Sequence, residues 1–447
     1  MLQAVRNAFL LPSLRRKIVF TLLILIVYRI ASQIPIPQVN QEALQALTSG
    51  GGGGTGFEVF QFLDLLSGGA LLQFSVLAMG VYPYITASII IQLLTPMIPA
   101  LEELSREGEQ GRNKINQYTH WLTVPLAALQ AFGQVSIAQQ TFPGVIVDFG
   151  FQFDPLGTLA TIVTMTAGSM FAVWLGELIT EQGVGNGVSI IIFGGIVAEL
   201  PGRVWQFIQL QEYVTLAIFL VVTIVTLAVI VTVSEGQRRI PVQYSKRVRG
   251  NKVYGGQSTH IPLKVNSAGM IPLIFAQSIL IFPSSIAGFF AQSPNTVLSS
   301  IGLFVVNNFS PRPEAWPYWI TYFIMVVLFT FFYTDVIFKQ QNLAENLQRQ
   351  GGFIPGLRPG RATGNYLTTV MRRITLVGAL FLGGVAILPW IVQGFMGLAG
   401  FGASSSGVTS TLLVTSTGLL IVVGVALDTM KQLEAQLLMR RYEGFIR

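Results

Sequence analysis

Long apolar segments are the feature that most restricts how this chain of 447 residues can fold. Ten stretches are mostly apolar and close to the roughly 20 residues that a helix needs to cross the hydrocarbon core of a bilayer. These predicted spans are Lys17–Ile34, Ser75–Pro96, Tyr118–Ala138, Pro155–Ile179, Gly187–Trp205, Val214–Val233, Val265–Phe290, Trp316–Ile337, Ile374–Phe395 and Gly407–Met430. We therefore expect an all-α integral membrane protein with ten transmembrane helices.

The composition supports this fold class. Hydrophobic residues make up 51% of the chain and charged residues only 11%, whereas about a quarter of the residues of a soluble domain are charged. A chain of this length and composition is too apolar to be wetted on all sides, so it must face lipid. It contains no cysteine, which excludes disulfides and thiolate metal sites.

The Lys and Arg residues predict the orientation. With ten spans, both termini lie on the same side, and 24 of the 27 Lys and Arg residues fall on that side. Arg203 and Arg312 fall on the opposite side, and Arg29 lies inside the first span. Because Lys and Arg are enriched on the cytoplasmic side, both termini are predicted to be cytoplasmic. We interpret Arg29 as a side chain that snorkels or pairs locally.

Ten spans divide into two sets of five, which gives an N-terminal half of residues 1–210 and a C-terminal half of residues 211–447. An odd number of spans in each half means that the halves enter the membrane in opposite senses. This permits an inverted repeat with a pathway between the halves. The inference rests on parity, because the two halves show no residue-level match.

The spans lack the groups that catalysis or ion coupling would need. The two histidines, His120 and His260, lie at cytoplasmic helix ends or in loops, and no HExxH, GxSxG or GxxxxGK[ST] motif occurs. No pair of carboxylates lies near the middle of the membrane, where charge is costly and kept for a purpose. The alternative classes are an intramembrane enzyme and an ion-coupled secondary transporter. The sequence lacks the catalytic or ion-binding residues that either class would need. We predict no catalytic residue, no metal and no cofactor.

One apolar segment is too short to be a span. Residues Glu58–Leu66 carry apolar side chains at helical spacing between the glycines of Gly50–Gly54 and the Ser67–Gly69 joint. By pattern alone, an interfacial helix on a loop is the favoured interpretation.

Seven blocks, in order along the chain, resemble the SecY family of bacterial protein-translocase channels. They are SGGALLQFSVLAMGVYPYITASIIIQLL (Ser67–Leu94), GRNKINQYTH (Gly111–His120), GELITEQGVGNGVSIIIFGGIVA (Gly176–Ala198), RRIPVQYSKR (Arg238–Arg247), IPLKVNSAGMIPLIFA (Ile261–Ala276), GGFIPGLRPGRAT (Gly351–Thr363) and GLLIVVGVALDTMKQLEAQLLMRRYEGF (Gly418–Phe445). One departure is His120, where the family commonly has Arg after QYT.

The resemblance implies an hourglass channel between the two halves. Such a channel passes unfolded secretory polypeptides outward and releases hydrophobic segments sideways into lipid. The implied partners are the SecE and SecG subunits, the motor ATPase SecA, the ribosome, and secretory and membrane proteins with signal sequences. The implied location is the bacterial inner (plasma) membrane, or the thylakoid membrane in a cyanobacterium.

The resemblance also assigns a pore ring of aliphatic side chains from the second, fifth, seventh and tenth spans. The matching residues are Val81, Ile85, Val188, Ile192, Ile274 and Ile421. Val81 with Ile85 and Val188 with Ile192 are i, i+4 pairs, so each pair shares one helix face. Hydrophobic constrictions of this kind gate by dewetting. Without the resemblance, ordinary helix packing explains the same residues better.

Two further elements follow from the resemblance. The short helix, at about residues 57–66, matches the plug that blocks the external funnel at rest. Its residues are Phe57, Phe60, Phe62, Leu63, Asp64, Leu65 and Leu66.

The resemblance also assigns a polar cluster at the lateral gate, which is the seam between the second and third spans on one side and the seventh and eighth on the other. The matching residues are Gln92, Thr123 and Asn266. Without the resemblance, such polar groups would be interpreted as forming ordinary hydrogen bonds between helices.

The large cytoplasmic loops, at about residues 235–262 and 340–372, are expected to dock a motor or ribosome. The first loop suggests a protruding hairpin around Tyr254–Gly256, and the second holds Arg358 in a rigid turn. The expected docking residues are Arg238, Arg239, Lys246, Arg247, Arg249, Lys252 and Arg358. The alternative is that these charges serve only as the positive-inside signal.

Overall fold

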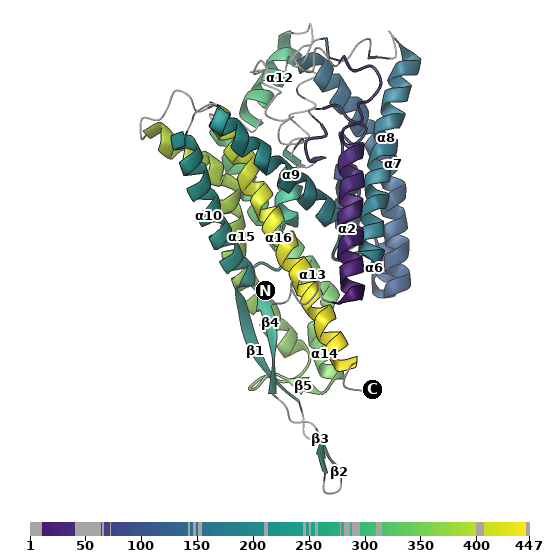
Figure 1. Ribbon diagram of the computed structural model, residues 1–447. Helices are drawn as coiled ribbons and strands as arrows, with labels where there is room; N and C mark the ends of the chain where they lie inside the picture. Colours follow the sequence, from purple (N-terminus) through teal and green to yellow (C-terminus); the bar gives the residue numbers. More distant parts are fainter. Residues whose placement is uncertain are drawn as a thin grey trace.

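The computed structural model describes residues 11–40, 64, 67–71, 73–141, 144–145, 149–150, 154–209, 213–244, 247–249, 252–254, 258–277, 279–280, 287, 296–309, 315–398 and 406–443. The fold is mostly helical (Figure 1). The longer helices are α2 (Pro12–Ala31), α5 (Tyr82–Leu94), α7 (Glu109–Thr141), α8 (Pro155–Gln182), α9 (Gly187–Gln209), α10 (Tyr213–Glu235), α12 (Thr296–Phe309), α13 (Trp316–Gln341), α15 (Arg361–Leu398) and α16 (Ser406–Glu443). Two short helices are α6 (Pro99–Arg106) and α14 (Leu343–Arg349).

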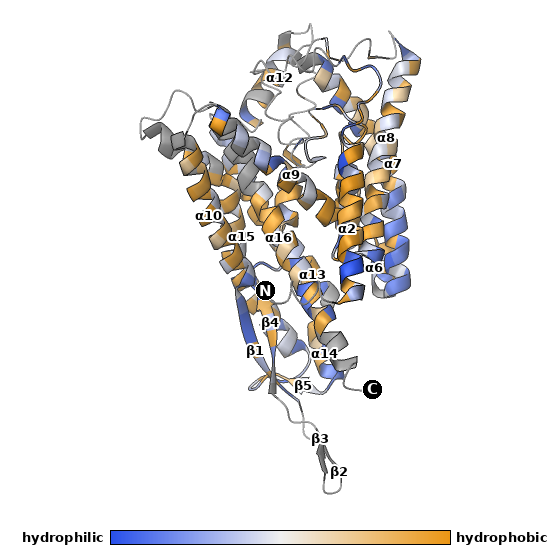
Figure 2. Ribbon diagram, viewed as in Figure 1, coloured by the Kyte–Doolittle hydropathy of each residue, from blue (hydrophilic) through white to orange (hydrophobic). Residues whose placement is uncertain are grey.

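The helices gather in two groups that meet at α9. Helix α8 contacts α2, α5, α7 and α9, while α15 contacts α10, α13 and α16. Helix α9 also contacts α10 and α16, so it joins the two groups (Figure 1). Apolar residues run along the helices, and polar residues gather at the end that holds α6 and β1 (Figure 2). This banding is typical of a protein that crosses a membrane.

Among the described residues, three helices are long and apolar enough to cross a membrane. They are Pro155–Gln182, Trp316–Arg349 and Arg361–Leu388, and a bent pair of helices, Tyr82–Leu94 with Pro99–Ser105, would make a fourth. The other predicted spans coincide with helices that are shorter, more polar or incompletely described. The prediction of ten spans therefore stays a prediction.

The second predicted span differs from the structure. Ser75 forms an isolated bridge with Pro35, residues 76–81 form turns, and α5 begins only at Tyr82. Gly80 has a φ of 50°, a left-handed conformation that ends regular helix, and Pro83 occupies the first turn of α5, where its missing N–H costs nothing. At its other end, α5 is bent by 104° relative to α6. Neither break can be predicted from the apolar composition of this segment alone.

A small sheet lies beyond the helices, at the polar end of the molecule (Figure 1). Strand β1 (Gln237–Tyr244) pairs antiparallel with β4 (Ser258–Lys264) on one side and with β5 (Gly352–Phe353) on the other. Between β1 and β4, strands β2 (Arg247–Arg249) and β3 (Lys252–Tyr254) form a hairpin, but its innermost pair is Arg249 with Lys252, so it closes before the predicted Tyr254–Gly256. Strand β5 comes from the second large loop, so the two loops form one body.

This body has its own apolar core. Ile240, Val242 and Leu263 of the sheet pack against Leu347 of α14 and Leu367 of α15. The three-stranded sheet is therefore packed against the helix ends, while the β2–β3 hairpin projects away from it (Figure 1).

Close backbone contact holds the turn segment 75–81 against α8. A Cβ atom added at Gly168 of α8 would lie 2.0 Å from the carbonyl oxygen of Val76. A Gly168→Ala substitution should therefore separate the two backbones and destabilise the protein by about 1–3 kcal/mol, as overpacking typically does.

The measurement is the thermal unfolding midpoint of the purified protein in detergent. Gly133→Ala in α7 is the matched control, because nothing lies within 4 Å of a Cβ at that position. Equal midpoints for the two variants would contradict the close contact.

Candidate functional site

The aliphatic residues predicted as a pore ring largely come together. Val81, Ile192 and Ile421 are buried in one hydrophobic cluster, and Ile85 and Val188 pack against it. We call these five residues the ring cluster. The sixth residue, Ile274, is also buried, and Met270, one turn before it, packs against the same cluster. The structure thus joins side chains of α5, α9 and α16 that are more than 300 residues apart in sequence.

Backbone geometry fixes the positions of the ring cluster residues. Val81 is the N-cap of α5, and its carbonyl accepts the backbone N–H of Ile85 at 3.1 Å, so the two side chains start one helical turn. Val188 and Ile192 lie in the first turns of α9, directly after Gly187. A Cβ at Gly187 would lie 1.8 Å from the carbonyl oxygen of Gly176, so only glycine allows α9 to begin this close to α8.

The three polar residues assigned to the lateral gate make their described hydrogen bonds locally. The Gln92 side chain donates to Ser88 Oγ at 3.2 Å, and the buried Thr123 hydroxyl donates to the Thr119 carbonyl at 2.7 Å. Each bond stays within one helix. Asn266 Oδ1 is buried and has no hydrogen-bond partner in the part of the chain that the structure describes. These groups therefore do not latch together through the hydrogen bonds that are described.

A polar contact that the sequence did not reveal involves α7, the helix that carries Thr123. His120 Nε2 of α7 lies 2.7 Å from Glu177 Oε1 of α8. The His120 ring also faces Tyr84 of α5, with the ring centroids 5.5 Å apart. His120 thus links three helices at the position where the sequence departs from the family. The sequence marked this contact only by a histidine at position 120, where the family commonly has Arg.

Most residues of the predicted plug lie outside the described residues: Phe57, Phe60, Phe62, Leu63, Leu65 and Leu66. Asp64 is described, and it is helical and buried. Its carbonyl accepts hydrogen bonds from Ser67 Oγ and from the backbone N–H of Gly69, both at 3.0 Å. A helix therefore ends at the Ser67–Gly69 joint.

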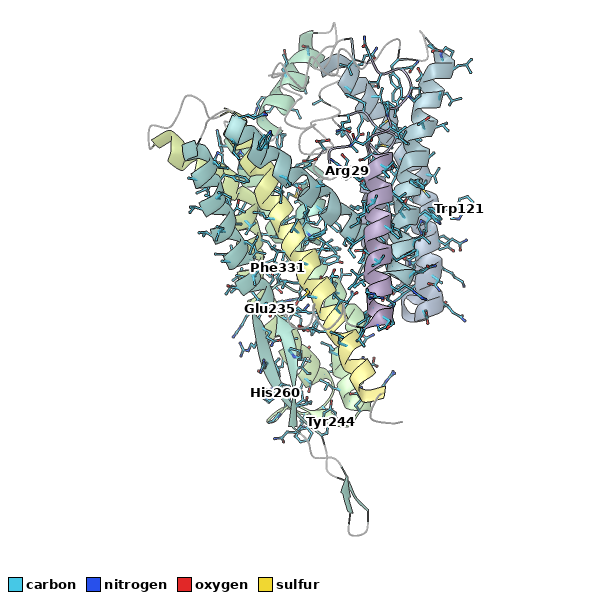
Figure 3. All side chains as sticks on the ribbon, in the orientation of Figure 1. Arg29, Trp121, Glu235, Tyr244, His260 and Phe331 are labelled. Atoms are coloured by element: carbon cyan, nitrogen blue, oxygen red, sulfur yellow. The ribbon has the colours of Figure 1, made fainter. Side chains whose placement is uncertain are left out.

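The predicted docking residues fall on the sheet body. Arg238 and Arg239 are exposed on β1, and Arg358 is exposed on a turn that follows β5. That turn is held by a hydrogen bond from the Thr363 hydroxyl to the Arg358 carbonyl at 2.9 Å. Arg247, Arg249 and Lys252 belong to the β2–β3 hairpin, and Lys246 lies outside the described residues. Figure 3 labels Tyr244 and His260, which mark the same body.

None of the predicted site residues lines the cavity of about 250 Å³ between α13 and α15. Its lining includes Asp335, Arg372 and Phe331, the last of which is labelled in Figure 3. Among the described residues, no three His, Asp or Glu side chains lie close enough to hold a metal ion. The described geometry therefore offers an aliphatic ring and basic loops, and no reactive centre.

Comparison with known proteins decides the family. Residues 75–430 match the profile of the SecY family. The chain is 43% identical to the protein translocase subunit SecY of Streptomyces coelicolor, over all of both chains. It is also 43% identical to the SecY of Thermotoga maritima, covering all of this chain and 98% of that one.

The chain belongs to the SecY family. The relatives are named as translocase subunits and not as enzymes, and this chain accordingly is a multi-pass membrane protein and not an enzyme. Solved structures share the SecY fold at low identity. One titled "The structure of a protein conducting channel" has a TM-score of 0.61 and 17% identity, and covers 94% of this chain and 92% of that one. Sec61 in a canine ribosome-channel complex has a TM-score of 0.59 and 16% identity, with the same coverage.

The buried amide oxygen of Asn266 gives a prediction for this chain. An unsatisfied polar group in a protein interior typically costs about 1–3 kcal/mol. Asn266→Leu should therefore stabilise the resting arrangement of helices and reduce transport of substrates with weak signal sequences.

Transport of strong and weak signal sequences, together with the thermal midpoint, checks this prediction. Thr123→Val is the control, because the Thr123 hydroxyl bonds only within its own helix in the described structure. If weak signals were transported as well as in the parent protein, the prediction would fail.

Proposed function

We propose that this chain is the protein-conducting channel of a translocase. It passes unfolded secretory polypeptides across the membrane and releases hydrophobic segments laterally into lipid. The observation that carries the proposal is the ring cluster, in which α5, α9 and α16 contribute aliphatic side chains to one buried site. Full-length identity of 43% to SecY translocase subunits supports the same function.

The chemistry of the ring suits a channel that accepts many sequences. Branched aliphatic side chains offer no hydrogen bond or charge, so they contact every polypeptide with similar weak affinity. When no polypeptide is present, they close on one another and exclude water, as hydrophobic gates do. The ring therefore needs no catalytic group, and the energy for transport must come from a partner.

The proposed architecture has ten transmembrane helices in two inverted halves, residues 1–210 and 211–447, around an hourglass pore. The contacts of α9 with α10 and α16 support a junction between these halves. The Glu58–Leu66 helix acts as the plug on the external side. One of the similar structures is titled "The plug domain of the SecY protein stablizes the closed state of the translocation channel and maintains a membrane seal".

The sheet body is the proposed docking surface for a motor ATPase such as SecA or for a ribosome. The exposed Arg238, Arg239 and Arg358 give it the positive charge that ribosomal RNA would attract. We also propose SecE and SecG as partner subunits. The membrane is the bacterial plasma membrane or, in a cyanobacterium, the thylakoid, with both termini cytoplasmic.

Site-specific photocrosslinking tests the channel directly. A photoreactive residue at Ile192 or Ile85 should capture a secretory polypeptide that is stalled during transport, because these side chains belong to the ring cluster. The same residue at Ile224 of α10, which is 66% exposed on the outer surface, is the matched control. Adducts at Ile224 but none at Ile192 would contradict the proposal.

A charge reversal tests the docking surface. Arg358→Glu should abolish motor-driven export by inverted membrane vesicles, while the protein still inserts and folds, because the side chain is exposed and makes no core contact. ATP-dependent export is the measurement.

Arg349→Glu is the control, since it makes the same charge change on the exposed surface of neighbouring α14. Equal losses from the two variants would assign the effect to net charge, and normal export with Arg358→Glu would remove the docking role of this residue.

A further inference from the structure

Arg29 makes a polar contact that the proposed transport function leaves unexplained. It lies in the last turn of α2 (Figure 3). The outer face of this helix is apolar and exposed, with Leu22, Ile26 and Ile30 each more than half accessible. A guanidinium group within an apolar span is costly, so its hydrogen-bond acceptors indicate what it is kept for.

Two consecutive residues of α2 bind two consecutive carbonyl groups. Arg29 Nη1 donates to the Gly68 carbonyl at 2.5 Å, and the Tyr28 hydroxyl donates to the Ser67 carbonyl at 3.1 Å. Tyr28 and Ser67 are both buried. Hydrogen bonds from a charged donor are stronger than neutral ones, so the Arg29 bond is the main contribution.

The bound carbonyls belong to a helix end. Asp64 and Ser67 are helical, and Gly68 and Gly69 follow with φ values of 69° and 83°. Left-handed glycine is the usual way to end a helix, and it leaves the last carbonyls without partners inside the helix. Arg29 and Tyr28 supply those partners from another element, and a cation is favourable at a helix C-terminus.

Helix α9 also contacts this helix end. A Cβ at Gly68 would lie 2.5 Å from the Cα of Gly195 in α9, so the two backbones touch. A Cβ at Gly69 would lie 2.8 Å from Glu199 Oε1 and 3.6 Å from Arg29 Nη1. The carboxylate of α9 and the guanidinium of α2 therefore flank the same glycine.

We propose that Arg29 and Tyr28 are positioning residues for the resting seal of the channel. They fix the helix end formed by Asp64, Ser67 and Gly68 against α2 and α9. The inference rests on the proposed function, in which the preceding helix is the plug. A few hydrogen bonds are strong enough to hold this end at rest and weak enough for a transported polypeptide to break.

The test uses the complete channel, reconstituted with its partner subunits in vesicles. Arg29→Met removes the charged donor and retains a long apolar side chain. We expect ion permeability of the resting vesicles to rise about tenfold, the order of change that losing one charge-assisted hydrogen bond gives. Polypeptide transport should continue. Arg29→Lys should leak less than Arg29→Met, and Arg16→Met, on the exposed cytoplasmic end of α2, is the matched control.

Thiol labelling gives an independent readout. The chain has no cysteine, so a single Ser67→Cys substitution reports on the helix end. This position is 1% exposed, and we expect a membrane-impermeant maleimide to label it from outside only when Arg29→Met or Tyr28→Phe is also present. Ser75→Cys, buried at 0% but outside the contact, should stay unlabelled.

The outcomes separate this inference from the proposed function. Deletion of Phe57–Leu66 should make the vesicles leak. If the deletion leaks but Arg29→Met neither leaks nor exposes Ser67→Cys, the inference is overturned and the channel function stands. If the deletion does not leak, the sealing role fails and the inference fails with it. Absence of transport by the parent channel would overturn the proposed function itself.

Discussion

Aliphatic packing between α5, α9 and α16 is the contact on which the rest of the structure depends. Val81, Ile192 and Ile421 come from distant parts of the chain and are buried together. Because lipid is as apolar as these side chains, burial alone gives little driving force for helix association in a membrane. Close packing and small residues must hold the helices instead. The glycine contacts of α8 and α9 meet that need, since Gly176 and Gly187 bring the two backbones together.

The same constraint explains why apolar and charged contacts lie in different parts of the molecule. In the proposed channel, a transported polypeptide must separate the ring cluster, and weak, non-directional contacts allow this without a large energetic penalty. Directional interactions are placed elsewhere: the His120–Glu177 contact joins α7 to α8, and the Lys431–Glu235 pair joins α16 to α10 at 3.0 Å. In the proposed arrangement, the basic sheet body lies outside the membrane region, where charge is solvated. In the proposed channel, charge thus serves partner binding and contacts between helices, and the apolar ring serves passage of the polypeptide.

Much of this arrangement was predictable from the sequence, because apolar runs and glycine positions are local signals. The helices α8, α10 and α13 begin within a residue of their predicted starts. The non-helical stretch Ser75–Val81 was missed because its composition is as apolar as that of a helix, and only Gly80 and Pro83 mark the break. The pairing of β5 with β1 joins residues about 110 positions apart, which no local pattern reveals. Likewise, Arg29 was visible as an unusual charge, but its acceptor at Gly68 depends on tertiary contact.

The most direct test of the central claim is to bridge the ring cluster. In this cysteine-free chain, Ile192→Cys and Ile421→Cys can be joined by a short, reducible bismaleimide across α9 and α16. If polypeptides pass through the ring cluster, motor-driven export should stop when the bridge forms and resume when the bridge is reduced, and either single-cysteine variant should export normally. Export at the parent rate through the bridged protein would show that polypeptides pass elsewhere, and would contradict the proposed pathway.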